Sequence, residues 1–133
     1  MSKYSEKCIA PSKDDKPNIA SFLFSDGANV SVVAFAGVLY LELYMDDLSI
    51  SFKGKASGTT RPVIAKSIGK LYYNNLNDLT NGCDFECNFW GVYPSAYPYI
   101  NFIHGSPTFA TFQGDLTPLI WIGGGNGQWS SSG

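Results

Sequence analysis

Trp121-Ile122-Gly123-Gly124-Gly125-Asn126-Gly127-Gln128-Trp129 is a glycine cluster that follows an apolar strand near the C-terminus. A phosphate-binding loop is also rich in glycine, but it leads from a strand into a helix whose N-terminal amides hold the anion. Only three serines and a glycine follow Trp129, so we expect no such helix. The run instead predicts a strand terminus with an architectural use, either a close crossing over a neighbouring strand or a turn with positive φ. The glycines concerned are Gly123, Gly124, Gly125 and Gly127.

The composition predicts a single all-β domain. The chain has 133 residues with 14 Gly, 15% aromatic and 15% charged residues, a mixture that suits short strands and tight turns better than helices. Turn signals separate about eight apolar or alternating segments, which is typical of a sandwich or a barrel. Closing the sheet removes its exposed edges, so we expect a closed eight-stranded barrel whose interior is nearly filled by side chains.

Alternation of apolar and polar residues places the individual strands. Residues 29–45 form one kinked strand or two strands interrupted at Gly37, with Val33 and Phe35 on the same face as the leucines at 39, 41 and 43. Residues 48–53 alternate most clearly, and the last strand is expected at residues 117–123. Residues 74–80 carry a capping-type Asn and allow a two-turn helix, the only helix that we predict.

The ends of the chain differ in composition from the domain. Residues 1–18 carry few apolar side chains, so we expect a flexible N-terminal tail, an ordered domain over residues 19–129 and a flexible C-terminal tail over residues 130–133. No secretory signal segment is recognisable at the N-terminus. The protein is therefore expected to be secreted if a signal segment has been removed, and cytoplasmic otherwise.

Charge and hydropathy exclude two classes of partner. All nine Lys and Arg residues precede Leu71, so the aromatic C-terminal half lacks the basic stripe that nucleic-acid binding needs. The longest uncharged apolar stretch, residues 27–41, is shorter than the roughly 20 residues of a membrane-spanning helix. We expect neither nucleic-acid binding nor a transmembrane helix.

Several segments resemble one known family. Tyr99-Ile100-Asn101-Phe102-Ile103, Phe109 and the run from Ile120 to Trp129 are similar to the C-terminal half of the virulence-associated proteins, the Vap family of actinobacterial intracellular pathogens. Residues 52–60 resemble that family's glycine-rich strand and loop, and residues 69–79 its strand and short helix. The resemblance covers most of residues 29–129. It implies an antiparallel barrel with Greek-key connections, a disordered N-terminal arm and a non-enzymatic role at the host endolysosome.

Candidate chemical groups mostly have structural interpretations. His104, the only histidine, lies in a predicted turn, and Asp46 and Asp47 are adjacent turn residues that point apart. Cys83 and Cys87 lie about 13 Å apart in an extended strand, too far for a disulfide. The redox state of Cys8 is left open, as is that of the other two. We therefore predict no enzyme, no metal and no cofactor.

Exposed aromatic residues are the main functional candidates. Trp90, Tyr93, Tyr97 and Tyr99 lie in an uncharged segment with two prolines, and aromatic residues of this kind contact proteins, lipids or sugars. The alternative is a loop folded back as a lid on the barrel. Trp129 is expected to close one open end of the barrel. The leading hypothesis is a monomeric barrel that acts on a host or neighbouring-cell partner, with the endolysosomal membrane as one candidate. The alternative is a carbohydrate- or small-ligand-binding module that uses residues 93–99.

Overall fold

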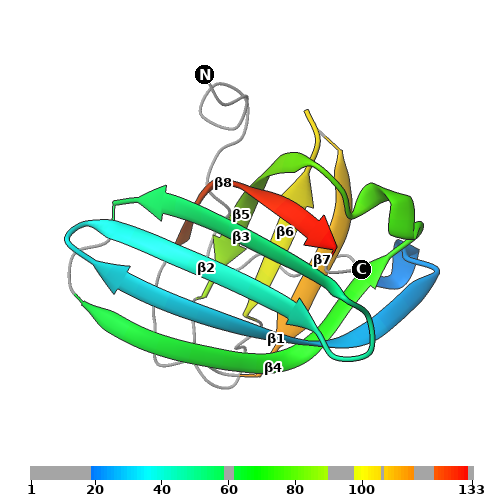
Figure 1. The fold of residues 1–133 in the computed structure, drawn as a ribbon, viewed down its shortest axis with the longest axis horizontal. Coiled ribbons are helices and arrows are strands. Elements are labelled where there is room, and N and C mark those ends of the chain that lie inside the picture. The colour runs from blue at the N-terminus through cyan, green and yellow to red at the C-terminus, as the bar shows by residue number, and fades with distance from the viewer. Residues whose placement is uncertain (1–18, 59–61, 90–97, 106, 116–121, 132–133) are drawn as a thin grey trace.

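Eight strands form the part of the protein that the structure describes (Figure 1). The computed structural model describes residues 19–58, 62–89, 98–105, 107–115 and 122–131. The strands are β1 (Phe24–Phe35), β2 (Val38–Met45), β3 (Ile50–Ser57), β4 (Val63–Tyr73), β5 (Gly82–Asn88), β6 (Tyr99–Ile103), β7 (Thr108–Gly114) and β8 (Ile122–Ser131). Two single-turn 3₁₀ helices, η1 (Ile19–Ser21) and η2 (Leu76–Asp78), accompany them. In the described part of the chain no helix is long and apolar enough to cross a membrane.

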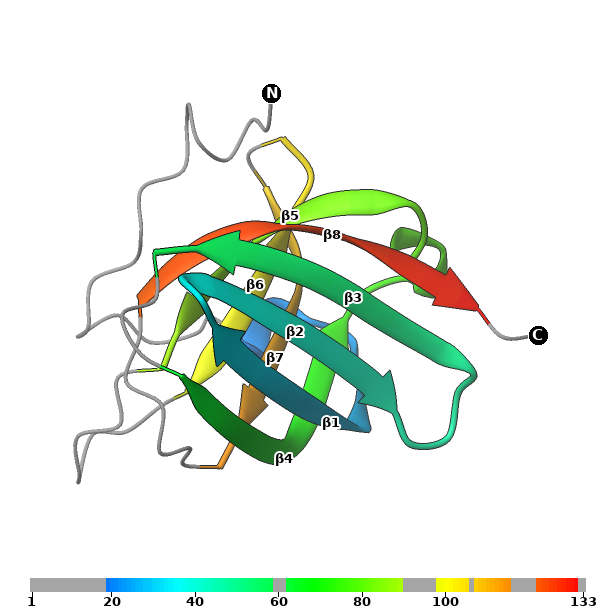
Figure 2. The ribbon, with the colours of Figure 1, turned by 60° about the vertical axis from the view of Figure 1, so that its left-hand side comes forward.

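The sheet closes into a barrel with the strand order β1-β2-β3-β8-β5-β6-β7-β4. Strands β1 to β3 are joined in sequence and β4 returns to lie beside β1, which is the arrangement of a Greek key. The second half repeats this pattern, because β8 returns to lie beside β5 (Figure 2). The two Greek keys meet along β3–β8 and β4–β7. The predicted all-β, eight-stranded antiparallel barrel with Greek-key connections is confirmed.

The turn between β1 and β2 reverses the expected burial of two residues. Ala36 and Gly37 both have positive φ, 54° and 81°, as the two central residues of a type I′ hairpin turn require. Phe35 therefore pairs with Val38, so even-numbered residues of β1 and odd-numbered residues of β2 face the interior. The prediction that Val33 and Phe35 share the leucine face was wrong, and Phe35 is 65% exposed.

The predicted two-turn helix is a single 3₁₀ turn. Asn75 has the capping role expected of it, because its Oδ1 accepts a hydrogen bond from the Asn77 amide at 2.9 Å. The Leu79 amide then donates to the Leu76 carbonyl at 3.0 Å, which closes a three-residue turn. The side chain of Leu79 is buried in the core, so this segment covers one end of the barrel.

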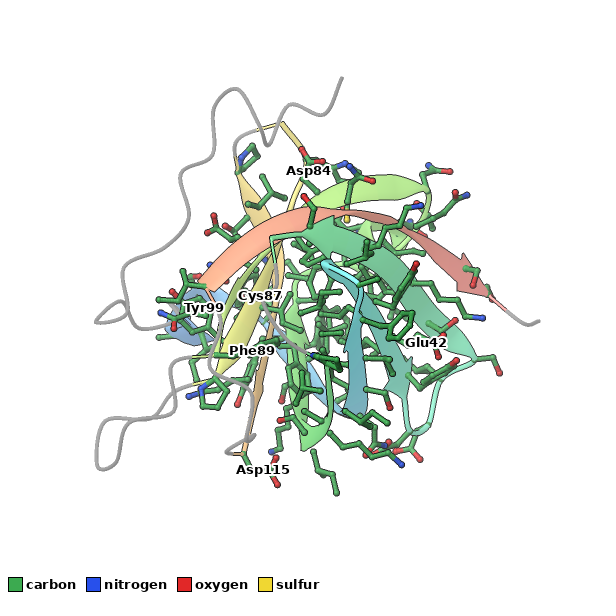
Figure 3. The ribbon with its side chains drawn as sticks, turned by 90° about the vertical axis from the view of Figure 1, so that its left-hand side faces the viewer. Glu42, Asp84, Cys87, Phe89, Tyr99 and Asp115 are labelled. Carbon is green, nitrogen blue, oxygen red and sulfur yellow. The ribbon has the colours of Figure 1, made fainter. Side chains whose placement is uncertain are left out.

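Side chains fill the barrel interior (Figure 3), and aromatic rings make up much of this core. The ring of Phe52 contacts those of Phe85, Phe102 and Trp129, with centroid distances of 5.8, 4.9 and 5.1 Å. The first two contacts are edge-to-face, an arrangement worth about 0.5–1.5 kcal/mol per pair beyond the area that it buries. Leucine, valine and further phenylalanine side chains complete the core.

Candidate functional site

The glycine run lies inside the last strand and does not end it. Of the strand predicted at residues 117–123, residues 117–121 lie outside the described residues; β8 is described from Ile122 to Ser131 and pairs with β3 on one side and β5 on the other. Gly127 faces Gly54 of β3 and Cys83 of β5 in this register. In the described part of the chain positive φ occurs only at glycines 37, 58 and 105 among the glycines, so the run forms no left-handed turn.

Close packing of β8 against β3 explains why two of these positions carry no side chain. A Cβ atom on Gly127 would lie 2.6 Å from Cζ of Phe52 and closer still to the carbonyl oxygen of Lys53. A Cβ atom on Gly125 would lie 2.9 Å from the Cβ atom of Ala56. Of the two predicted architectural uses of glycine, Gly125 and Gly127 therefore serve the close approach to a neighbouring strand.

Trp129 belongs to the core. The indole is 2% exposed and packs between Phe52 and Phe102, with a centroid distance of 4.9 Å to the latter. Its strand continues beyond it, because Ser130 and Ser131 pair with Ser51 and Ile50 of β3. The expectation that Ser130 and Ser131 belong to a flexible tail is therefore corrected: their pairing with β3 continues β8 and holds the buried ring over the aromatic cluster.

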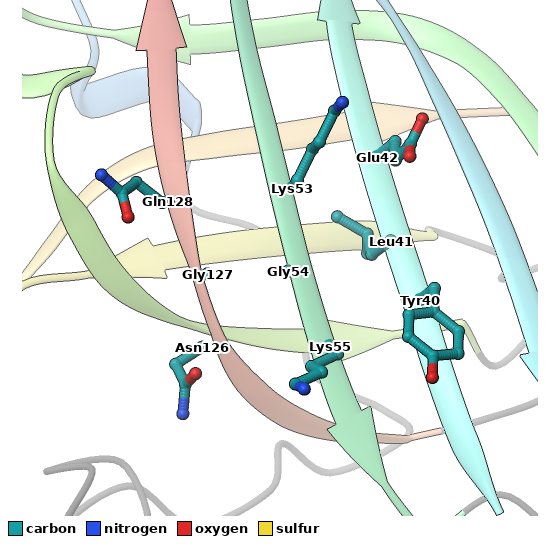
Figure 4. A pocket seen from close by; sticks show the side chains of 9 residues that line it. All are labelled: Tyr40, Leu41, Glu42, Lys53, Gly54, Lys55, Asn126, Gly127 and Gln128. Atoms are coloured by element: carbon teal, nitrogen blue, oxygen red, sulfur yellow. The ribbon is translucent and has the colours of Figure 1, made fainter.

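A hollow of about 460 Å³ lies on the outer surface across β2, β3 and β8 (Figure 4). Its floor is the backbone at Leu41, Gly54 and Gly127. The side chains around it are Tyr40, Glu42, Lys53, Lys55, Asn126 and Gln128. Glycine at the inward positions 54 and 127 lets β3 and β8 approach closely, and the outward side chains on either side of these positions surround the hollow.

Strand register arranges these side chains in two rows. Tyr40 pairs with Lys55, which pairs in turn with Asn126. In the second row Glu42 pairs with Lys53, which pairs with Gln128. Figure 4 shows the two rows on opposite sides of the glycine floor.

Glu42 is already engaged at the edge of the hollow. Its Oε1 accepts a hydrogen bond of 2.6 Å from the hydroxyl of Tyr44. That hydrogen bond raises the pKa of Tyr44, because the proton is shared with a carboxylate. Glu42 thus presents a fixed acceptor beside Lys53.

A second hollow of about 410 Å³ adjoins the first and shares Asn126 and Gly127 with it. It lies over β5 and the β6–β7 turn, where its lining includes Asp84 and His104. The His104 ring is exposed and stacks on Phe109 at 4.5 Å between centroids. The two hollows together cross five strands of the outer surface.

The aromatic residues singled out in the sequence do not form this site. Trp90, Tyr93 and Tyr97 lie outside the described residues. Tyr99 is 2% exposed, so the expectation of an exposed contact residue is wrong there. The residue begins β6 and pairs with Asn88 and Gln113, in a part of the outer face where Asn88 and Thr111 are buried as well.

Cys83 and Cys87 are buried structural residues. Cys83 and Cys87 are unbridged, as predicted, whereas Cys8 lies outside the described residues. Burial raises the pKa of Cys83 to about 12 and raises that of Cys87 well above its usual range. Both thiols are therefore neutral and weakly nucleophilic at physiological pH.

Other candidate groups have local structural roles. Asp46, in the β2–β3 turn, accepts a hydrogen bond of 2.6 Å through its Oδ1 from the side-chain Nδ2 of Asn29. Within the described ranges, no three His, Cys, Asp or Glu residues come together as metal ligands would.

Sequence reasoning missed the outer hollow because its residues come from three strands that only the Greek-key topology brings together. One sequence signal was available. Asn126 and Gln128 alternate with Gly125 and Gly127, which places two exposed amides on the outward face of a strand that carries glycine at the neighbouring inward positions.

Comparisons with known proteins identify relatives of this chain. The family model described as Rhodococcus equi virulence-associated protein matches residues 11–130, so the match begins inside the predicted tail. The solved structure of VapB from the intracellular pathogen Rhodococcus equi is 23% identical, with a TM-score of 0.70 over 81% of this chain and 97% of that one. VapD from the same organism is also 23% identical, with a TM-score of 0.67 over 80% and 97%. No curated protein sequence matches the chain.

Proposed function

Because the chain belongs to the Rhodococcus equi virulence-associated protein family, we propose that it is a non-catalytic barrel that acts through its outer surface on a host or neighbouring cell. The observation that carries this proposal is the packing of the interior. Phe52, Phe85, Phe102 and Trp129 occupy the centre of the barrel, where a lipocalin-like protein would hold its ligand. Recognition then falls to the exterior.

An exposed apolar row on the exterior supports a membrane, or a protein on a membrane, as the partner. Ile64 of β4 pairs with Val33 of β1, which pairs with Tyr40 of β2, and all three side chains point outward. Ile64 is 73% exposed. Phe35, which lies two residues after Val33 at the end of β1, points outward on the same face. Contiguous exposed apolar side chains are typical of protein or membrane contact sites. The endolysosomal membrane is the candidate that we favour.

Flotation with phospholipid vesicles tests this proposal. The protein is expected to float with vesicles containing anionic lipid at acidic pH, at neutral pH or at both. Phe35→Ser and Ile64→Ser should weaken flotation, because each removes an apolar side chain that would enter the lipid surface. Leu76→Ser is the control, since Leu76 is exposed on η2, outside the row. Absence of flotation at both pH values would remove the membrane as partner.

The outer hollow favours a second candidate function, binding of a carbohydrate or small ligand. The hypothesis based on residues 93–99 falls largely outside the described residues, and Tyr99 is buried. The hollow at β2, β3 and β8 supplies what that hypothesis needed, an exposed aromatic ring beside amide and charged groups. Screening on a glycan array, followed by titration monitored by tryptophan fluorescence, would test binding without assuming a particular sugar.

A further inference from the structure

We propose that the hollow over Gly54 and Gly127 binds an acidic saccharide, with the carboxylate of a uronic-acid unit on Lys55, its ring on Tyr40 and its hydroxyls on Asn126. This inference rests on the proposed function, in which the exterior performs the recognition. It names a binding site and a ligand class for that exterior.

The shape of the hollow suits a compact polar ligand. Its volume of about 460 Å³ lies within the range of roughly 300–1,000 Å³ that is usual for small-molecule sites. The floor at Gly54 and Gly127 is backbone, partly exposed although both positions face inward. A ligand can therefore approach the sheet itself between the two rows of side chains.

Charge distinguishes the two lysines. The cross-strand neighbours of Lys53 are Glu42 and Gln128, so an acidic side chain already lies beside it on the neighbouring strand. The cross-strand neighbours of Lys55 are Tyr40 and Asn126, both neutral. A carboxylate brought by a ligand would thus be attracted most strongly to Lys55, because opposite charges favour each other's ionised form.

The neutral neighbours of Lys55 fit the rest of a sugar. Tyr40 is 49% exposed and offers a ring face against which the C–H face of a pyranose can pack. Asn126 is exposed on the other side of Lys55, and its amide can both donate to and accept from hydroxyl groups. Adjacent strands lie about 4.8 Å apart, so the backbone positions of Tyr40 and Asn126 are about 10 Å apart, with Lys55 between them.

The second hollow extends the binding surface across β8. It begins at Asn126 and Gly127, where the first hollow ends, and continues over β5 toward His104. A chain of several sugar units can therefore leave the uronic-acid position and follow the groove across β8. For this reason we expect an oligosaccharide to bind more tightly than a monosaccharide.

Titration with tetragalacturonic acid, monitored by amide chemical shifts of the purified protein, tests the proposal. Maltotetraose, which has the same number of units and no carboxylate, is the neutral control ligand. We expect tetragalacturonic acid to shift the amide signals of residues 53–55 and 126–128 and to bind at least about tenfold more tightly than maltotetraose, because a charge-assisted hydrogen bond is the stronger kind.

Variants separate the roles of the side chains. Lys55→Gln should weaken binding of the acidic ligand by about tenfold and leave maltotetraose unaffected, because it removes only the charge. Lys53→Gln should have a smaller effect, since Glu42 already faces that lysine. Tyr40→Ala should weaken the binding of both ligands, because both use the aromatic ring face. Lys70→Gln is the matched control, because Lys70 is an exposed lysine of β4 that pairs with Gly27 and Gln113, away from the hollow.

Three results would overturn the proposal: no shift with either ligand, shifts confined to residues elsewhere, or equal losses in Lys55→Gln and Lys70→Gln. The side chains concerned are exposed, and unchanged circular dichroism would show that each variant is folded. Vesicle flotation uses phospholipid without sugar, so failure to bind a saccharide and failure to bind a membrane are independent outcomes.

Discussion

Replacing Gly127 by Ala should destabilise the barrel more than any surface substitution of similar size. The new Cβ atom would lie 2.6 Å from Cζ of Phe52, and closer to the Lys53 carbonyl oxygen and the Gly54 Cα atom. Moving Phe52 to an ordinary contact of 3.4 Å shifts that ring by about 0.8 Å, and the backbone of β3 must shift farther. The ring has little room, because it packs on three other aromatic side chains.

The expected magnitude follows from two opposing effects. Overpacking of a core costs about 1–3 kcal/mol, and contact with backbone on a neighbouring strand places this substitution at the upper end. Alanine also restricts the unfolded chain more than glycine does, which stabilises the folded state by about 0.4–1 kcal/mol. We expect Gly127→Ala to lower the free energy of unfolding by about 2 kcal/mol, which corresponds to a fall in Tm of roughly 5–10 °C for a domain of this size.

Gly82→Ala is the matched control for this experiment. Gly82 begins β5 in the same sheet, and a Cβ atom there would lie 3.4 Å from the Gly127 carbonyl oxygen, an ordinary contact. The control should be within about 0.5 kcal/mol of the parent protein in denaturant unfolding. If Gly127→Ala and Gly82→Ala were equally stable, the close approach of β8 to β3 would not be the reason for glycine at this position.

Four further predictions concern the core, the two buried thiols and the contact between β4 and β7. Trp129→Ala should lower the free energy of unfolding by about 3–5 kcal/mol in guanidinium titrations, because it leaves a cavity among aromatic rings; a loss below about 1 kcal/mol would contradict the packing described. In a Cys8→Ser background, Cys83 and Cys87 should not react with a thiol reagent at neutral pH until the protein unfolds, and rapid labelling of the folded protein would refute their burial. The folded pKa of Cys83 is raised to about 12 from 9.0, so its contribution to stability is complete below pH 9 and is lost as the pH rises toward 12; Cys83→Ser should make the alkaline decline in stability shallower. Asp115→Ala should cost about 1–3 kcal/mol in thermal unfolding, because the carboxylate accepts hydrogen bonds from the Ser67 hydroxyl and the Ile68 amide where β7 meets β4, and an unchanged Tm would show that this contact is dispensable.

Local patterns predicted much of the architecture. Alternation around Ile50 and Phe52 identified β3, and the spacing of turn signals and the scarcity of helix-forming residues indicated a closed all-β barrel. Such features depend on residues close together in the chain, because a strand with one buried face must alternate whatever its partners are.

Other features depended on geometry that the local pattern does not contain. Gly37 marked an interruption between β1 and β2, but only the two-residue turn formed with Ala36 decides that Phe35 points outward. The glycine run was consistent with a turn or a close crossing. Because β8 pairs with a strand on each side, Gly125 and Gly127 lie in the close approach of β8 to β3. The same pairing places Trp129 in the core.

By itself, the sequence determined the class of fold, because burial of alternating apolar side chains needs only local periodicity. The tertiary structure alone decided which outward side chains meet. Tyr40, Lys55 and Asn126 become neighbours because the return of β8 to β3 places distant strands about 4.8 Å apart, and no pattern within any one strand specifies that pairing.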